Sequence, residues 1–152
     1  MIRKDREITD IKEIESIIEK SLVCRLAMAD EGFPYIVPLC FGYEDNSLYF
    51  HSAAKGKKLD ILRKNNNVCF EFDTGCETKP AEKACKWDMK YKSIVGFGKA
   101  SFIDDHESKR RSMDIIMRQY SDDAYEYSES ALKSTVVVKV EISSMTGKKD
   151  NS

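Results

Sequence analysis

The stretch LYFHSAAKGKKL, residues 48–59, joins a short apolar strand directly to the start of a helix. The strand ends at His51 and Ser52, and three lysines then surround a glycine, namely Lys55, Gly56, Lys57 and Lys58. Backbone N–H groups at a helix N-terminus point outward, and the helix macrodipole favours negative charge there. Lysine adds a mobile positive charge at such a position. The stretch therefore predicts a binding site for an anion such as a phosphate group.

Length and charge narrow the class of protein. The chain has 152 residues, with 25 Lys and Arg against 26 Asp and Glu, so its net charge is −1. This balance gives no general attraction to nucleic acid or to membrane surfaces. No apolar run reaches the roughly 20 residues that span a bilayer, and residues 1–6 lack the apolar core of a signal peptide. We expect one cytoplasmic domain over residues 1–152 that binds neither nucleic acid nor membranes.

The five cysteines do not indicate a disulfide framework or a metal site. Their number is odd, and the expected setting is reducing. Cys24, Cys40 and Cys69 lie in apolar runs typical of strands, where we expect them to be small core residues. Cys76 and Cys85 show no CxxC spacing, and the chain has only two histidines, so we expect no structural zinc.

The order of predicted elements favours an antiparallel barrel. Asp10 begins the first helix as a capping residue, with an apolar stripe at Ile11, Ile14, Ile17 and Ile18. Six strands are expected at residues 22–28, 35–43, 47–51, 68–72, 90–103 and 134–143. Helices are expected at residues 56–64 and 106–120, the latter with Met113, Ile116 and Met117 inward, and an irregular loop at 73–88. The strands are mostly sequential and do not alternate with helices, so the class is mainly β (α+β) with peripheral helices.

Two local signals refine this topology. Asp30-Glu31-Gly32 reads as a turn that makes the first two strands a hairpin. Gly96 and Gly98 fall inside the predicted strand at 90–103. Glycine within a strand indicates a bulge or a close approach of another backbone.

Ordered motifs along nearly the whole chain now point to a family. They are RKDREI at 3–8, CRLAM at 24–28, GFPYIVPL at 32–39, FGY at 41–43, the stretch at 48–59, YKSIVGFG at 91–98 and TGK at 146–148. Together they resemble the FMN-binding split β-barrel proteins related to pyridoxamine 5′-phosphate oxidase. Within that superfamily the chain is most similar to the Nim-type group, the 5-nitroimidazole resistance proteins. The resemblance implies a six-stranded antiparallel split β-barrel that forms a homodimer, with FMN at the subunit interface and a small-molecule substrate.

The resemblance also implies roles for particular positions. Val37, Pro38 and Leu39 match the strand whose backbone lies along the flavin ring. His51 and Ser52 match the strand end near the ribityl chain and phosphate, and Lys57 and Lys58 match the basic positions that hold the phosphate. Tyr91 and Ser93 match a later strand that reaches the flavin from the same subunit or from its partner. Pyridoxamine phosphate oxidases carry an Arg-Lys pair where this chain has Ala54-Lys55, which argues against that activity.

Several of these residues also have a simpler interpretation. The lysines fit a solvated helix face, although two adjacent helical lysines cannot both face one phosphate. His51 fits either a satisfied strand end or a hydrogen-bonding and proton-transferring group. Pro38 cannot donate to a strand ladder, which fits an edge strand and also leaves backbone groups for the flavin. Trp87 and Tyr91 fit either the core or a dimer cleft.

Arg25 lies among apolar neighbours in the first predicted strand, and a buried arginine needs a partner. We expect either a salt bridge or a contact with the FMN phosphate, and we favour the phosphate contact.

The leading hypothesis is an FMN-dependent oxidoreductase that reduces a small acceptor such as a nitroaromatic, as a nitroimidazole reductase would. The flavin carries the chemistry, so no catalytic residue is predicted beyond a possible role for His51. One alternative is a non-catalytic module that binds, stores or senses FMN. Another is a haem-binding split-barrel relative, with His51 or His106 as the axial ligand.

Overall fold

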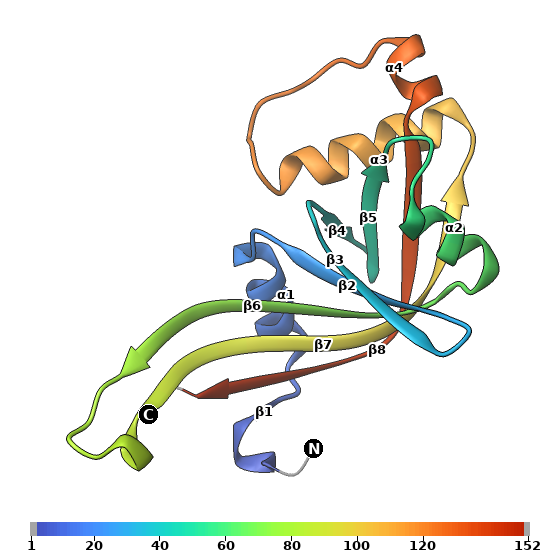
Figure 1. Ribbon diagram of the computed structural model, residues 1–152. Coiled ribbons are helices and arrows are strands. Elements are labelled where there is room, and N and C mark those ends of the chain that lie inside the picture. Colours follow the sequence, from blue (N-terminus) through green and yellow to red (C-terminus); the bar gives the residue numbers. More distant parts are fainter. Residues whose placement is uncertain (1–2, 151–152) are drawn as a thin grey trace.

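One antiparallel sheet forms the body of the protein in the computed structural model, which describes residues 3–150 (Figure 1). Its strands within this range are β1 (Glu7–Ile8), β2 (Cys24–Asp30), β3 (Phe33–Leu39), β4 (Gly42–Glu44), β5 (Ser47–Ser52), β6 (Asn67–Lys79), β7 (Asp88–Ile103) and β8 (Val136–Asp150). The helices are η1 (Lys4–Arg6), α1 (Ile11–Lys20), α2 (Lys57–Lys64), η2 (Ala84–Lys86), α3 (His106–Arg118) and α4 (Glu129–Ser134). Neighbouring strands follow the order β3-β2-β6-β7-β8-β5-β4, and β1 pairs with β8.

A two-residue connection draws the two edges of the open sheet toward each other. β3 and β4 stand at opposite ends of the strand order, yet only Cys40 and Phe41 separate them in the chain. The sheet must therefore curl until its two edges approach each other. This confirms the predicted antiparallel split β-barrel with peripheral helices. The expected single strand over residues 35–43 is wrong, because the chain leaves β2 at Leu39 and pairs with β5 from Gly42.

The strand count therefore differs from the six that were expected. β4 separates from β3 at the crossing, and the two-residue strand β1 adds to β8, which gives eight strands in the described residues. The helix α4 was not predicted either. The predicted turn before β3 is confirmed, with Glu31 at φ 49° and Gly32 at φ 87°, and Asp45 and Asn46 make a similar turn between β4 and β5.

A hairpin arm extends from the barrel where the sequence predicted a loop. β6 continues to Lys79 and β7 starts at Asp88, so much of the expected loop at 73–88 is paired strand (Figure 1). Gly75, at φ 67°, interrupts the alternation of side chains along β6, and the register of β6 against β7 shifts between Thr74 and Glu77. Such a shift hides the strand period from sequence reasoning. We use the name "arm" below for the hairpin of residues 74–92.

β8 also runs past its expected end at residue 143. A register shift opposite Phe97 and Gly98 marks a bulge, after which β8 continues beside the arm to Asp150. The buried Asp150 carboxylate pairs with Arg6 (2.9 Å) and with Lys79 (3.1 Å). These ion pairs join η1 and β6 to the end of β8, beside the base of the arm.

The two glycines of β7 serve the close approach that the sequence indicated. A Cβ atom on Gly96 would collide with the ring of Phe70, and one on Gly98 would collide with the backbone carbonyl of Glu141. The strand at this point therefore packs directly on its neighbours. Larger residues would force β6 and β8 away from β7.

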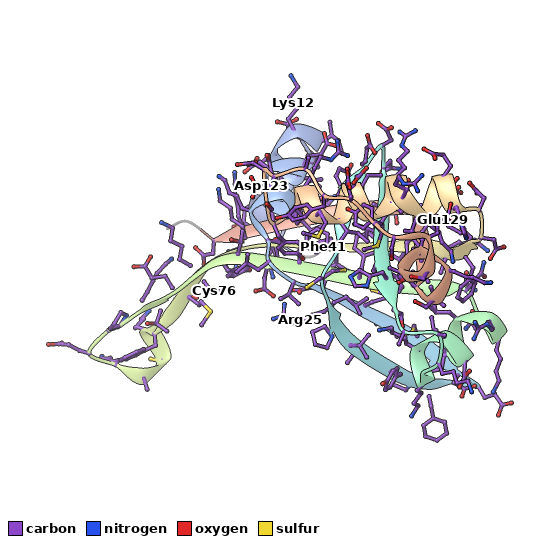
Figure 2. All side chains as sticks on the ribbon, turned by 90° about the horizontal axis from the view of Figure 1, so that it is seen from above. Lys12, Arg25, Phe41, Cys76, Asp123 and Glu129 are labelled. Carbon is purple, nitrogen blue, oxygen red and sulfur yellow. The ribbon has the colours of Figure 1, made fainter. Side chains whose placement is uncertain are left out.

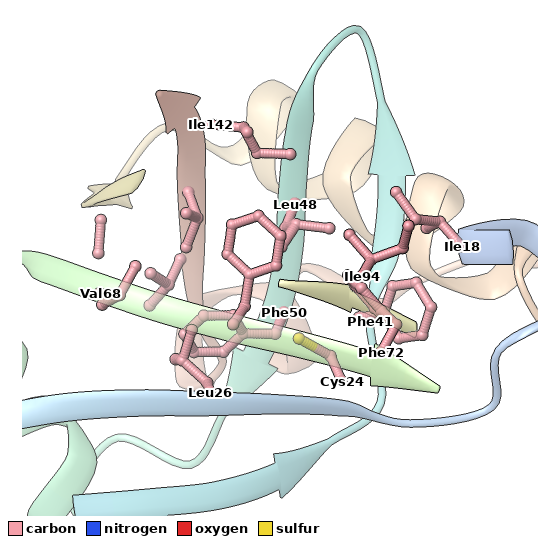
Figure 3. Close-up of a cluster of buried hydrophobic side chains, with 14 of the residues drawn as sticks. Ile18, Cys24, Leu26, Phe41, Leu48, Phe50, Val68, Phe72, Ile94 and Ile142 are labelled. Atoms are coloured by element: carbon pink, nitrogen blue, oxygen red, sulfur yellow. The ribbon is translucent and has the colours of Figure 1, made fainter. Parts of the chain in front are cut away.

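The core lies inside the curled sheet and beneath the helices (Figure 3). Asp10 caps α1 by accepting from the Lys12 N–H (3.2 Å), as predicted. Ile14, Ile17 and Ile18 are buried, but Ile11 is 51% exposed and does not belong to the core stripe. On α3 the buried apolar residues are Ile115 and Ile116, while the expected Met113 and Met117 are only half-buried.

The predicted core cysteines differ in their environment. Cys24 is buried and Cys69 is half-buried, but Cys40 is exposed at the crossing between β3 and β4, contrary to expectation. Cys76 and Cys85 lie exposed on the arm, and all five thiols are free. Among the described residues, no helix is long and apolar enough to cross a membrane.

The end of α3 fixes the crossing segment in place. The Tyr120 hydroxyl accepts from the Phe41 backbone N–H (3.0 Å) and donates to the Leu22 carbonyl (2.9 Å). The Phe41 side chain is buried against Phe72, with ring centroids 4.8 Å apart. Gln119, next to Tyr120, donates to three carbonyls at the end of α1.

We predict that Tyr120→Phe lowers the free energy of unfolding by about 1–3 kcal/mol, because it leaves the Phe41 N–H without its acceptor. Tyr125→Phe is the matched control, since its hydroxyl contacts only the nearby Ser121 hydroxyl (2.9 Å) at the surface. Urea unfolding of both variants measures the difference. Equal losses in the two variants would show that the hydroxyl bonds of Tyr120 do not anchor the crossing.

Candidate cofactor site

The N-terminus of α2 presents backbone donors beside two lysines. Its first intrahelical hydrogen bond runs from the Asp60 N–H to the Gly56 carbonyl (3.2 Å). No side chain caps this end, and Gly56 is exposed. The amides of the first turn are therefore directed outward, as an anion site requires.

Lys57 and Lys58 point to different neighbours, as expected for adjacent helical residues. The Lys57 ammonium lies 4.8 Å from the ring centroid of Tyr35 in β3, a cation–π contact that links α2 to the sheet edge. Lys58 is half-buried and lies close enough to His51 for its charge to act on the imidazole. One lysine thus faces β3 while the other faces the end of β5.

His51 and Ser52 form the end of β5, where they pair with Val137 and Val136 of β8. Burial, and then the positive charge of Lys58, lower the pKa of His51 below its ordinary value of 6.5. The imidazole is therefore neutral at neutral pH and keeps a lone pair for hydrogen bonding. The Ser52 hydroxyl donates to the adjacent Ala53 carbonyl (3.0 Å) and stands just before α2.

Val37, Pro38 and Leu39 lie on β3, which has β2 as its hydrogen-bonded neighbour and ends the sheet. The predicted edge position of Pro38 is therefore confirmed. Val37 and Leu39 pack partly against the core, while Pro38 is exposed. On the side of β3 away from β2, no strand in the described residues pairs with its backbone groups.

A cavity of about 350 Å³ lies between the β2–β3 hairpin and α2. Its lining comprises Asp30, Glu31, Phe33, Pro34, Tyr35, Lys57 and Ile61. Tyr35 and Lys57 connect this cavity to the N-terminus of α2. Sequence reasoning missed Tyr35, although the GFPYIVPL motif contained it.

Arg25 is placed differently from expectation. Its side chain is 45% exposed and pairs with Asp73 (2.8 Å) and Glu71 (3.3 Å) on β6. The expected burial is wrong because Cys24, Leu26 and their alternate neighbours face the core, while Arg25 faces outward (Figure 2). The salt bridge is thus present, and the phosphate contact stays a prediction.

One of the two carboxyl groups that hold Arg25, that of Glu71, has a raised pKa. Burial, followed by the hydrogen bond and negative charge of Asp73, raises the pKa of Glu71 to about 7. The positive charge and hydrogen bond of Arg25 lower the pKa of Glu71 and partly offset this rise. Burial and a nearby negative charge both disfavour the ionised carboxylate of Glu71.

Tyr91 lies on the arm and Ser93 at its base, where Ser93 faces Asp73, the partner of Arg25. Tyr91 pairs with Asp150, and Ser93 pairs with Asp73 and Lys148. The start of β7 lies at the left of Figure 1, whereas α2 lies at the right. One chain therefore brings together α2, β3 and the end of β5, whereas β7 begins on the other side of the molecule (Figure 1).

Comparison with known proteins identifies a family and solved structures that are similar to this chain. A family model described as pyridoxamine 5′-phosphate oxidase matches residues 10–149. The chain is 43% identical to a candidate 5-nitroimidazole antibiotic resistance protein from Bacteroides thetaiotaomicron, covering 93% of this chain and 85% of that one, with a TM-score of 0.85. No match is found among curated proteins.

Two further solved structures share the fold. An FAD-binding protein from Mesorhizobium loti is 25% identical, with 96% of this chain and 98% of that chain covered and a TM-score of 0.69. An FAD and haem binding protein from Mycobacterium smegmatis is 16% identical, with 97% and 74% covered and a TM-score of 0.88. At that identity the second likeness concerns the fold alone.

We predict that Lys58→Ala raises the pKa of His51, because the substitution removes a positive charge that disfavours the imidazolium. An NMR titration of the imidazole protons measures this, with His51→Asn to assign the signal. Lys55→Ala, which removes an exposed lysine of the same stretch, is expected to leave the His51 pKa unchanged. An unaltered pKa in Lys58→Ala would contradict the predicted coupling.

Proposed function

Since this chain belongs to the pyridoxamine 5′-phosphate oxidase family, we propose that it is a flavoprotein that binds FMN and reduces a small acceptor such as a nitroaromatic compound. The observation that carries the proposal is the N-terminus of α2, where outward amides meet Lys57 and Lys58 beside the edge strand β3. The relative from Bacteroides thetaiotaomicron supports the choice of acceptor, because its identity extends over almost the whole chain.

The site fits the phosphate of FMN. Amides of the first turn of α2 would donate to its oxygens, one of Lys57 and Lys58 would contact it, and the other would add positive charge nearby. The Ser52 hydroxyl, next to this turn, would add a neutral donor. The exposed side chain of Arg25 already has two carboxylate partners, so we assign the phosphate mainly to α2.

The edge of β3 fits the flat part of the same ligand. Val37, Pro38 and Leu39 would lie along the ring system, where edge backbone groups can pair with its polar rim. The neutral imidazole of His51 would accept a hydrogen bond near the ribityl chain. FMN, when bound, supplies the capacity to pass electrons from a donor to an acceptor, and the protein binds and orients it.

Reduction of a nitro group to a nitroso group takes up two electrons and two protons and releases water. We propose reduced nicotinamide as the electron donor. Pyridoxamine phosphate oxidase activity itself is not proposed, because Ala54 stands where those oxidases carry arginine.

We further propose that the protein is a homodimer with the flavin at the subunit interface. The start of β7 lies on the other side of the molecule from α2 (Figure 1), so Tyr91 and Ser93 of this strand would reach the flavin of the partner subunit. Each site would then consist of α2, β3 and β5 from one copy and the arm from the other.

We predict that Lys57→Ala/Lys58→Ala weakens FMN binding about 10- to 100-fold, because charged hydrogen bonds of about 1.5–3 kcal/mol are lost. Binding of riboflavin, which lacks the phosphate, is expected to change little. Lys64→Ala at the other end of α2 is the control. Titration of flavin fluorescence measures all three affinities, and full FMN affinity in the double variant would exclude the phosphate site.

We also predict that the FMN-loaded protein loses its visible absorbance with excess reduced nicotinamide under anaerobic conditions. Added nitroimidazole is then expected to restore the absorbance as it is reduced. Spectra recorded after each addition test both steps. Bound FMN that neither donor nor acceptor affects would favour a storage or sensing protein instead.

A further inference from the structure

The outer face of the sheet carries a charged cluster that joins β2 to β6 (Figure 2). Arg25 of β2 donates to Asp73 (2.8 Å) and to Glu71 (3.3 Å), two residues on the same face of β6. Their side chains are 33–45% exposed, and ion pairs at such exposure add little stability. Since backbone hydrogen bonds already join the two strands, the cluster contributes little to the fold. We use the name "outer cluster" below for Arg25, Glu71 and Asp73.

The strand register places the outer cluster beside the strand that we assign to the flavin. Residues that pair directly across antiparallel strands have side chains on the same face. Pro38 of β3 pairs with Arg25, and Arg25 pairs with Glu71. At a strand spacing of about 4.8 Å, Glu71 lies two strands, or roughly 10 Å, from Pro38. Glu71 therefore faces the same side of the sheet as the exposed Pro38, within reach of a molecule that lies against β3.

Glu71 is the member of the outer cluster that holds a proton near neutral pH. Burial, and then the hydrogen bond and negative charge of Asp73, raise the pKa of Glu71 to about 7, although Arg25 lowers it in part. Cys76 lies beyond Asp73, with its Sγ 3.8 Å from the Asp73 carboxylate. Partial desolvation and then the charge of Asp73 raise the pKa of Cys76, so its thiol stays neutral. A carboxyl group that titrates near the working pH is suited to proton transfer.

The other strands bring little further charge to this part of the face. Val95 of β7 lies directly opposite Glu71, and Thr146 of β8 lies opposite Val95. Lys148 of β8 is one row further along, beyond Ser93 of β7. The helix α1 packs on β6 and β7 from the core side, so its carboxylates do not share the face of Glu71. The proton affinity of Glu71 is therefore set mainly within the outer cluster.

We propose that Glu71 donates the proton that the acceptor takes up while it is reduced. This inference rests on the flavin-dependent reduction proposed above and adds a catalytic residue to it. A nitro group becomes a nitroso group and water by taking up one hydride and one proton. The hydride comes from the reduced flavin, and the proton comes from the carboxyl group of Glu71. One N–O bond of the nitro group breaks, and its oxygen leaves as water.

The outer cluster can both release and recover this proton. After the transfer, the Glu71 carboxylate is stabilised by the Arg25 guanidinium 3.3 Å away. The negative charge of Asp73 then favours return of a proton to Glu71. Water supplies that proton, because the Glu71 side chain is partly exposed. The opposite effects of Arg25 and Asp73 keep the carboxyl group near the balance point between its two forms.

A carboxyl NMR titration of the protein without flavin tests the outer cluster itself. We expect Glu71 to titrate near pH 7, with Glu71→Gln used to assign its signal. Asp73→Asn is expected to lower the Glu71 pKa, because it removes a negative charge that disfavours the carboxylate. Arg25→Gln is expected to raise that pKa, because it removes a positive charge that favours the carboxylate. An ordinary Glu71 pKa of about 4.3, or shifts without these opposite signs, would overturn the proposal.

The oxidation of reduced, FMN-loaded protein by a nitroimidazole tests the role in the reaction. Its rate is expected to fall as pH rises through the Glu71 pKa, because the donor then loses its proton. In Asp73→Asn the fall is expected at lower pH, and in Arg25→Gln at higher pH. A salt bridge with a merely structural role would not move the profile in opposite directions. Stopped-flow absorbance across a pH series measures the rate in each variant.

Removal of the acid itself supplies the strongest contrast. Glu71→Gln is expected to slow the oxidation by nitroimidazole about 100-fold below neutral pH and to leave little dependence on pH. Its FMN affinity and its reduction by reduced nicotinamide are expected to stay unchanged, because neither step uses this proton. Glu141→Gln is the matched control, since that carboxylate also lies on a strand beside a lysine, with Lys139 3.9 Å away. We expect no change in that variant.

The possible failures separate the two proposals. Equal oxidation rates in Glu71→Gln and the wild type would exclude Glu71 as the proton donor and leave the flavin assignment intact. A pH profile that neither flanking variant moves would do the same. A wild type that binds no FMN, or that passes no electrons to nitroimidazole, would reject the proposed function and this inference with it. The lysine variants of α2 test the cofactor site alone, and the carboxyl titration needs no flavin.

Discussion

The short crossing at Cys40 and Phe41 constrains the whole fold. Two residues span about 7 Å of extended chain, yet they join the two edges of a seven-strand path. The sheet can satisfy this only by curling around its apolar face. The buried Phe41 side chain, and its backbone N–H bound to Tyr120, hold the crossing against the core. β3 is thereby left with a free outer edge close to α2, where Lys57 contacts Tyr35.

The arm is stabilised by different interactions from those of the barrel. Inside the barrel, β7 packs so closely that Gly96 and Gly98 leave no space for a Cβ atom. Beyond the barrel, few core contacts remain, and the buried Asp150 with its two cationic partners joins η1 and β6 to the end of β8. A hairpin held in this way at its base keeps its direction while its tip stays in solvent. That combination suits a segment whose apolar side chains meet another molecule.

The sequence predicted those features that depend on local patterns. The start of α2 after Gly56, the turn before β3 and the role of the β7 glycines all follow from a few adjacent residues. Sequence reasoning gave the wrong burial for Cys40 and Arg25, where the pairing and alternation of strands decide which side chains are exposed. Cys40 reads as a core residue of a continuous strand, but the change of partner strand at the crossing exposes it. Arg25 reads as buried because its neighbours are apolar, yet strand alternation directs it outward to Glu71 and Asp73.

The division of the predicted cofactor residues into two groups is the most informative consequence of the topology. Lys57, Lys58 and His51 converge because α2 follows β5 directly, whereas Tyr91 and Ser93 belong to a strand that leaves the barrel in another direction. In one copy the two groups lie on different elements, and β7 begins on the other side of the molecule from α2 (Figure 1). Either the later strand takes no part in binding, or a second copy completes the site. The exposed side chains of Val95 and Phe97 lie on the same face of β7 as Tyr91 and Ser93, so that face is open to a further molecule.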